Sequence, residues 1–374
     1  MTCFHDANRG LLEALRNPDA VAPLLRGATG ADAVDGWSFD WGRVVDAASG
    51  RVQAVYTAPC APTCVIEAWG SLHPTTRSIY RLTDDPRLDT LARVLRRAPN
   101  LSVVRYRPGK RCMLSGSDRA PFVKVFNDGR GARMFEEAQA LWRAARRDID
   151  VDVACPISYE PALRALTHAR VDGVSIAGSL RRDGGVLARR LGSAAASIAV
   201  SPLVPRSAVR HGDELDRSCA RAVEIAALIP AVAPRLERVV FELGVRHGRL
   251  PERPLRPTHG SPHMSQWLLD GDDLALVDFD RFSWADPELD VATFVGEYTD
   301  EATANVPAVI EGFVAGYCDT YGALDPKRLD LYRCHKRIAK AYRVARSFRP
   351  DVERRVTRHL DEAMDVLQGA ETVA

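Results

Sequence analysis

The chain changes character along its length, and this change restricts the possible fold more than any other feature. Three short runs with strand character, joined by tight turns, fill residues 101–126, and in the last run, PFVKVF (121–126), the side chains alternate so that Phe122 and Lys124 share a face. An amphipathic helical pattern follows at 132–146, and helical patterns dominate beyond about residue 185. This order predicts an α+β protein, with a small antiparallel sheet followed by a larger, mainly helical region.

The remaining elements follow from the same patterns. Further strands are predicted near 154–160 and 164–173 and at 274–279. Asp325 and Pro326 have the residue types of a helix cap and first helical position. The predicted helices lie at 185–200, 216–244 (one helix, or two broken near Pro230), 302–320, 325–347 and 350–367. A loose connection is expected at 201–214.

The segment before residue 99 has a pattern of its own. RVQAVYTA (51–58) and CVIEAWG (64–70) predict two strands, and DPRLDTLARVLRRA (85–98) predicts an amphipathic helix that starts at Asp85. The expected parts are an N-terminal α/β extension over 1–98, a small sheet-containing lobe over 99–172 and a helical lobe over 173–374. A ligand site is expected in the cleft between the two lobes.

Charge and composition restrict the partners. The net charge of +2 means that acidic residues match most basic ones, which argues against nucleic acid or a membrane surface as the main partner. The chain has no apolar run of ~18 residues, and its first residues, MTCFHDANRGLLEALRN, lack the apolar segment of a signal peptide. Its eight cysteines are scattered. We therefore expect a cytoplasmic protein with reduced thiols.

Lys124 is the first candidate functional residue. It lies inside the apolar run FVKVF, where burial is costly unless the ammonium reaches an acid. The alternative is an edge-strand lysine that points to solvent. The next helix offers Glu136 and Glu137, and a glutamate about 13 residues downstream could pair back with Lys124. We favour this buried pair, which suits a lysine that binds nucleotide phosphates.

Asp278 and Asp280 form the second candidate group, at the end of the run LALVDFD. If the strand stays extended, both carboxylates project from the same side and repel each other unless a cation lies between them. Carboxylate oxygens suit Mg²⁺. For Asp278 we favour metal binding over a turn cap paired with an arginine such as Arg281. For Asp280 the two interpretations are balanced.

The segment HGSPHM places two histidines, His259 and His263, four residues apart. Gly260 and Pro262 make a helix improbable there, so a shared helical metal site is not expected. We expect His259 to pack inside the loop. His263 is nearer to the place where an acceptor molecule would enter.

The segments that contain these residues resemble those of a known protein family. HGSPHMSQWLLDGDDLALVDFDRFSWADPELDVATF (259–294) resembles the catalytic segment of the aminoglycoside phosphotransferase and choline kinase-like family, and VVRYRPGKRCML, FVKVF and FEEAQALW resemble its small lobe. The match spans about residues 100–345. It implies a two-lobed protein-kinase-like fold and ATP-dependent transfer of the γ-phosphate to a hydroxyl of a small molecule or modified peptide.

The resemblance also implies roles for single residues. Lys124 becomes the phosphate-binding lysine and Glu137 its partner, while Asp278 becomes the Mg²⁺ ligand. Pro108, Gly109 and Lys110 would form the turn over the phosphates, and 168–174 the hinge beside the adenine. Asp286 and Asp290 would brace the catalytic loop and begin the next helix.

Two residues depart from the family pattern. Ser261 replaces the catalytic aspartate, and Gln266 replaces the metal-binding asparagine, although its amide oxygen could still reach the metal. A serine cannot accept a proton at neutral pH, and general-base help is worth about 10²–10⁴-fold in rate. The chain could be an enzyme in which His263, Asp280 or the acceptor supplies the base. It could instead be a pseudokinase that binds nucleotide and serves a partner protein, or it could catalyse another nucleotide reaction such as adenylyl transfer.

Overall fold

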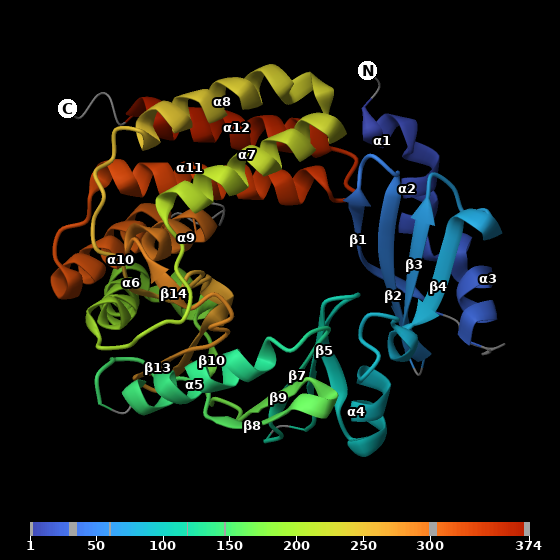
Figure 1. Ribbon diagram of the computed structural model, residues 1–374, viewed down its shortest axis with the longest axis horizontal. Helices are drawn as coiled ribbons and strands as arrows, with labels where there is room; N and C mark the ends of the chain where they lie inside the picture. Colours follow the sequence, from blue (N-terminus) through green and yellow to red (C-terminus); the bar gives the residue numbers. More distant parts are fainter. Residues whose placement is uncertain are drawn as a thin grey trace.

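The computed structural model describes residues 3–29, 36–59, 61–117, 119–145, 147–298 and 305–369. Figure 1 shows a small lobe built on strands β5–β9, a larger helical lobe, and an N-terminal sheet, β1–β4, that lies beside both. In the part of the chain that is described, no helix is both long enough and apolar enough to cross a membrane.

The small lobe is a five-stranded antiparallel sheet with one helix against it. The strand order is β5-β6-β7-β9-β8, and helix α5 packs on β8 and β9. These elements confirm the predicted order of three strands, a helix and two further strands. Their bounds are β5 Ser102–Arg107, β6 Arg111–Ser115, β7 Phe122–Phe126, α5 Gly131–Ala145, β8 Pro156–Glu160 and β9 Ala165–His168.

Strand β7 lies inside this sheet, with β6 on one side and β9 on the other. Lys124 is opposite Met113 on β6 and Leu166 on β9, and it is only 5% exposed. Lys124 is therefore a buried lysine of an interior strand. The alternative of an edge-strand lysine that points to solvent is wrong, because both edges of β7 are paired.

The helical lobe contains seven described helices and two small sheets. Strands β10, β12 and β13 form a three-stranded sheet, and β11 pairs with β14. The helices are α6 Ala177–Val200, α7 His211–Leu228, α8 Ala233–His247, α9 Glu288–Tyr298, α10 Val306–Tyr321, α11 Pro326–Ala345 and α12 Val352–Gly369. The strands are β10 Val174–Ser175, β11 Arg256–Thr258, β12 Trp267–Asp270, β13 Asp273–Leu276 and β14 Ser283–Ala285.

Several details of this lobe test the sequence predictions. The 216–244 pattern forms two helices, α7 and α8, because a short 3-10 turn at Pro230–Val232 separates them. The Asp325 side chain accepts a hydrogen bond from the Lys327 amide (2.9 Å) and caps α11, as predicted. Residues 302–304 of the predicted 302–320 helix lie outside the described residues. The 201–214 connection is partly ordered, since Ala208 forms a β-bridge with Trp284.

Helices α6 and α10 approach each other closely through glycines. A Cβ atom at Gly316 would lie 1.8 Å from the Arg189 carbonyl oxygen, and one at Gly192 would lie 2.0 Å from the Phe313 carbonyl oxygen. Only glycine permits this backbone approach, and the two helices pack in the same core as Trp267 and Leu276 of the β12–β13 hairpin.

We expect Gly316→Ala to lower the free energy of unfolding by about 1–3 kcal/mol, because the added methyl group must push two backbones apart. Urea denaturation of the purified variant measures this loss. Gly244→Ala in α8 is the matched control, since nothing lies within 4 Å of its added Cβ. That change should stabilise the protein by about 0.4–1 kcal/mol. Equal stability of the two variants would contradict the close contact.

The N-terminal extension combines three short helices with a four-stranded antiparallel sheet in the order β1-β2-β3-β4. The two predicted strands correspond to β2 and β3, whereas β1, β4 and α1–α3 were not predicted. The pairing of β1 with β2 shifts register between Phe39 and Trp41 and again between Val44 and Asp46, which disturbs the regular alternation of a strand. The predicted 85–98 helix is shorter than expected. The bounds are α1 Phe4–Ala7, α2 Arg9–Arg16, α3 Pro18–Thr29, β1 Ser38–Asp46, β2 Arg51–Ala58, β3 Ala61–Trp69, β4 Arg77–Arg81 and α4 Leu91–Arg97.

This extension shares its hydrophobic contacts with both lobes. One face of its sheet, with Val52 and Ile66, packs into the same core as Ile225 of α7 and Leu360 of α12. The segment around Leu88 and Leu91 packs against small-lobe residues such as Leu114. The Val44 amide also donates to the Arg346 carbonyl oxygen at the end of α11 (2.7 Å). The extension therefore packs against both lobes, beside which its sheet lies in Figure 1.

Candidate functional site

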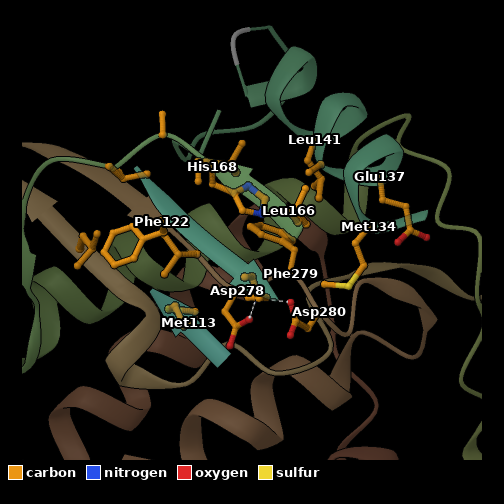
Figure 2. Close-up of a pocket in the computed structure, with 18 residues that line it drawn as sticks. Met113, Phe122, Met134, Glu137, Leu141, Leu166, His168, Asp278, Phe279 and Asp280 are labelled. Atoms are coloured by element: carbon orange, nitrogen blue, oxygen red, sulfur yellow. Dashed lines mark hydrogen bonds and ion pairs between the residues drawn. The ribbon is translucent and has the colours of Figure 1, made fainter. Parts of the chain in front are cut away.

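An apolar cavity of about 270 Å³ lies between the small-lobe sheet and the β12–β13 hairpin. Figure 2 shows its apolar side chains around the cavity, with the carboxylates of Asp278 and Asp280 at one end. His168, Ala169 and Val171 of the predicted hinge also contribute to the lining. The apolar walls include Met113, Phe122, Met134, Leu141, Leu166 and Phe279. A flat, apolar ligand with a charged tail would fit this distribution.

Lys124 and the two acids meet at the polar end of this cavity. Lys124 Nζ lies 2.9 Å from Asp278 Oδ1 and 2.6 Å from Asp280 Oδ1. The lysine comes from the small lobe and the acids from the large lobe, so the ion pairs cross the cleft. Burial lowers the pKa of Lys124, and Asp278 partly offsets this effect. Burial would raise the pKa of Asp278, but Lys124 and Arg111 outweigh it and hold that pKa below its usual value.

The reason for this convergence differs from the prediction. Strand β13 ends at Leu276, and Asp278 adopts a left-handed backbone conformation with φ of 68°. The strand is therefore not extended through Asp278 and Asp280, and the turn of the backbone after β13 brings the two carboxylates together. A left-handed conformation is unfavourable for a non-glycine residue and is found often at functional sites.

Arg111 is a site residue that the sequence analysis missed. It lies at the start of β6, and its guanidinium contacts the Asp280 carboxylate and lies 3.9 Å from Asp278 Oδ2. The acid pair thus receives two cations from the small lobe. No sequence signal distinguishes Arg111 from the chain's many other arginines, because its partner is 169 residues away.

The predicted ion pair between Lys124 and Glu137 is not formed. The contacts of the described residues place Glu137 Oε1 3.3 Å from the Arg206 amide and Oε2 3.9 Å from Arg133 Nε. The Lys124 ammonium instead donates hydrogen bonds to Asp278 and Asp280, so it does not pair with Glu137. Glu137 still lines the apolar cavity, and a role in nucleotide binding stays a prediction.

The predicted phosphate turn at 108–110 faces the N-terminal extension. Gly109, with φ of 67°, donates its N–H to Asp85 Oδ2 (2.7 Å) and accepts from Asn127 Nδ2 (3.1 Å). Asp85 was expected to start a helix, but its carboxylate instead fixes this turn. Gly109 and Lys110 line a second cavity, of about 640 Å³, rather than the apolar one. Their predicted contact with phosphates is not tested by this arrangement.

The loop that carries Ser261 is braced as the resemblance implied. Asp290, in the first turn of α9, accepts hydrogen bonds from the amides of His259 and Gly260, both at 2.8 Å. The His259 ring packs on Phe279 with ring centroids 4.4 Å apart, and burial lowers the pKa of His259 to about 4. His259 is therefore a neutral core residue, as predicted.

Asp286, two residues before α9, joins its segment to α11 and to Arg253. Its carboxylate accepts hydrogen bonds from Arg253 Nε (2.9 Å), Arg328 Nη1 (3.0 Å) and the Tyr332 hydroxyl (2.8 Å). Burial acts to raise the pKa of Asp286, but these donors keep it below its usual value. The Asp286 and Arg328 side chains are each 1% exposed and Arg253 is 22% exposed, so a largely buried network ties the segment before α9 to α11.

Ser261, His263 and Glu297 form a chain of polar contacts. Ser261 Oγ lies 2.7 Å from His263 Nε2, and His263 Nδ1 lies 3.6 Å from Glu297 Oε1. We assign the proton to Nδ1, because that nitrogen faces a carboxylate. Nε2 then accepts the Ser261 hydroxyl proton. Burial lowers the pKa of His263, so its imidazole is neutral at pH 7.

Gln266 lies between this chain and the acids. Its Oε1 accepts a hydrogen bond from the His263 amide (2.9 Å), and its Nε2 donates to Asp278 Oδ2 (3.5 Å). The side chain is within reach of the predicted metal position, but its amide must rotate before the oxygen could bind a cation.

A family comparison covers the segment that carries these residues. The model of the phosphotransferase enzyme family matches residues 110–331, which is more than half of the chain. A comparison with curated proteins gives no match.

Solved structures share the fold at low sequence identity. The choline/ethanolamine kinase family protein from Mesorhizobium loti is 14% identical, with a TM-score of 0.54, 76% of this chain and 94% of that chain covered. Amicoumacin kinase hAmiN, solved with AMP-PNP, Ca²⁺ and Ami, is 13% identical, with a TM-score of 0.56 and 75% and 94% covered. Choline kinase LicA from Streptococcus pneumoniae is 14% identical, with a TM-score of 0.50 and 75% and 98% covered. The chain belongs to the aminoglycoside phosphotransferase family of phosphotransferases and has its two-lobed, protein-kinase-like fold.

Proposed function

We propose that this protein transfers the γ-phosphate of ATP to a hydroxyl group of a small molecule or modified peptide. The observation that carries the proposal is the meeting of Lys124 with Asp278 and Asp280 at the polar end of an apolar cavity. The cavity suits an adenine ring, and its polar end suits a metal-bound triphosphate. Because ATP is the proposed donor, we also propose a cytoplasmic location.

The residues fit Mg²⁺ held jointly with the nucleotide. Mg²⁺ usually binds one or two carboxylates and completes its shell with phosphate oxygens and waters. Asp278 and Asp280 would supply the carboxylates, and Gln266 could supply an amide oxygen after rotation. When bound, the ion neutralises charge on the transferred phosphoryl group. Lys124 and Arg111 hold the pKa of Asp278 below its usual value, so its carboxylate is ionised and available to a cation.

The chain's own groups account for the remaining requirements of phosphoryl transfer. Lys124 can exchange its contact with Asp280 for a phosphate oxygen, because phosphate brings its own negative charge. An acceptor hydroxyl near Ser261 can give its proton to Ser261 Oγ while Ser261 passes its own to His263 Nε2. Glu297 then faces the imidazolium that forms. Ser261 and His263 together would thus replace the missing aspartate as the general base.

A pseudokinase is the second candidate, and the presence of Ser261 at the base position favours it. Such a protein would bind nucleotide at Lys124 and Asp278 without turnover and would act on a partner protein. Both candidates bind nucleotide at the same residues and differ in whether phosphoryl transfer follows, so an activity assay must decide between them.

The assay uses purified full-length protein, γ-labelled ATP, Mg²⁺ and a panel of hydroxyl compounds. We expect transfer of label to one class of acceptor, lost in Asp278→Ala. Nucleotide-dependent stabilisation without any transfer or ATP hydrolysis would favour the pseudokinase. Gain of ATP hydrolysis in Ser261→Asp would show that the missing carboxylate limits the rate.

We expect Asp278→Asn to remove the stabilisation that Mg²⁺ and ATP give together. A ligand at 100 times its dissociation constant stabilises a protein by about 2.7 kcal/mol, and loss of the metal ligand should reduce this to near zero. Thermal unfolding with and without Mg²⁺·ATP measures the change. Asp272→Asn is the matched control, since its side chain is fully exposed on the β12–β13 turn. Equal stabilisation in Asp278→Asn and wild type would contradict the assignment of Asp278.

A further inference from the structure

A second cavity lies where the N-terminal sheet faces the β5–β6 turn. It measures about 640 Å³, and eight arginine or lysine side chains line it against only two carboxylates, Glu67 and Asp85. Its walls come from strands β1–β4, the turn at 107–111, the segment from Phe126 to Arg130 before α5, and Arg346 at the end of α11. Much of it therefore belongs to the extension, which lies outside the part of the chain that matches the family.

Neither carboxylate is free to neutralise these cations. Glu67 accepts from Arg51 Nη2 (2.8 Å), Gln53 Nε2 (2.7 Å) and the Tyr80 hydroxyl (3.1 Å). Asp85 is engaged by the Tyr106 hydroxyl and the Gly109 amide, both at 2.7 Å, and by the Arg87 amide at 2.9 Å. Both acids thus hold the walls of the cavity in place.

Several of the cations have no acidic partner. Arg111 pairs with Asp280 and Arg130 with Asp128. The described part of the chain offers no carboxylate within ion-pair distance to the following four side chains: Arg43, Arg87, Arg107 and Lys110. Uncompensated cations in one cavity repel each other, and this repulsion is a cost that an anion would remove.

Neighbouring cations add to the effect of burial on the pKa of two of these groups. Burial lowers the pKa of Arg107 to about 10, with further contributions from Arg111 and Arg105. Burial also lowers the pKa of Lys110, and Arg43 and Arg346 are the next largest causes. Charges from the extension, the small lobe and α11 thus act on one another across the same space.

We propose that this cavity is a binding site for a compact, multiply charged anion, such as the phosphate or polycarboxylate part of a small molecule. Arginine guanidinium groups bind both chemistries through paired hydrogen bonds. The site is distinct from the apolar cavity, but Arg111 lines it and contacts Asp280 of the nucleotide end. A polycationic ligand would be repelled there.

The test is calorimetric titration of the full chain, saturated with AMP-PNP at a fixed free Mg²⁺ concentration. Inorganic pyrophosphate is the titrant in one arm and citrate in the other, so the two arms distinguish phosphate from polycarboxylate. We expect at least one of them to bind, with affinity at least ten-fold weaker in Arg43→Gln and in Arg87→Gln. Both variants should bind AMP-PNP as wild type does, because neither residue lines the apolar cavity.

Arg96→Gln is the matched control, an exposed arginine of α4 outside the cavity, and it should bind like wild type. Arg43 also donates to Gln53, so thermal unfolding checks that its variant is folded, and the exposed Arg87 gives an independent answer. The proposal is overturned if neither anion binds the nucleotide-saturated protein, or if both variants keep wild-type affinity. Those results would leave the proposed nucleotide site untouched.

Discussion

Lys124→Ala is expected to lower kcat/KM for phosphoryl transfer by about 10³-fold or more. Loss of a single preorganised group that stabilises transition-state charge typically costs 10²–10³-fold, and a cation at a transferring phosphoryl group can be worth more. Lys124 is buried and already directed at the acids that would hold the metal. Steady-state kinetics with γ-labelled ATP measures the effect.

Lys327→Ala is the matched control, because it removes the same side chain from an exposed position at the start of α11. This variant should leave kcat/KM unchanged. Lys124→Arg keeps the charge but not the shape of the ammonium, so we expect partial activity at most. If Lys124→Ala stayed within ten-fold of wild type, the lysine would be structural and the nucleotide would bind elsewhere.

His263→Ala is expected to lower kcat by about 10²–10⁴-fold, the usual worth of a general base. The imidazole must be neutral to accept a proton, and burial holds its pKa below the ordinary value of 6.5. Activity should therefore be constant above about pH 6.5 and should fall as the pH drops through the lowered pKa. A pH–rate profile between pH 4.5 and pH 8, at about half-unit steps, measures both features.

Two neighbouring charges provide a test that a purely structural role would not pass. Glu297 acts to raise the pKa of His263, whereas Arg343 acts to lower it. Glu297→Gln should thus move the acidic limb of the profile to lower pH, and Arg343→Gln should move it to higher pH. Shifts in the same direction, or none, would exclude His263 as the base. Full activity of His263→Ala would instead direct attention to Asp280 or to the acceptor itself.

Local sequence determined much of the fold. The alternation in PFVKVF, the helical spacing after it and the cap at Asp325 are properties of neighbouring residues, and each formed the predicted element. The N-terminal helices and β1 were not predicted, and their residues, such as Leu15 of α2 and Val44 of β1, pack into the same core as α7 and α12. Such contacts leave no periodic signal in one segment.

For the candidate site, too, some features are visible in the local sequence and others appear only in the tertiary structure. Lys124, Asp278 and the Ser261 substitution are visible in the sequence because each lies in a recognisable local motif. Only the tertiary structure decided that Lys124 contacts both acids instead of Glu137, that Arg111 joins them, and that Gly109 turns toward Asp85. Pairing between charges depends on distances across the cleft, and these distances are set by packing of segments more than 20 residues apart in every case. The sequence motifs therefore identify the charged side chains of the site, whereas the packing of distant segments determines which of them are in contact.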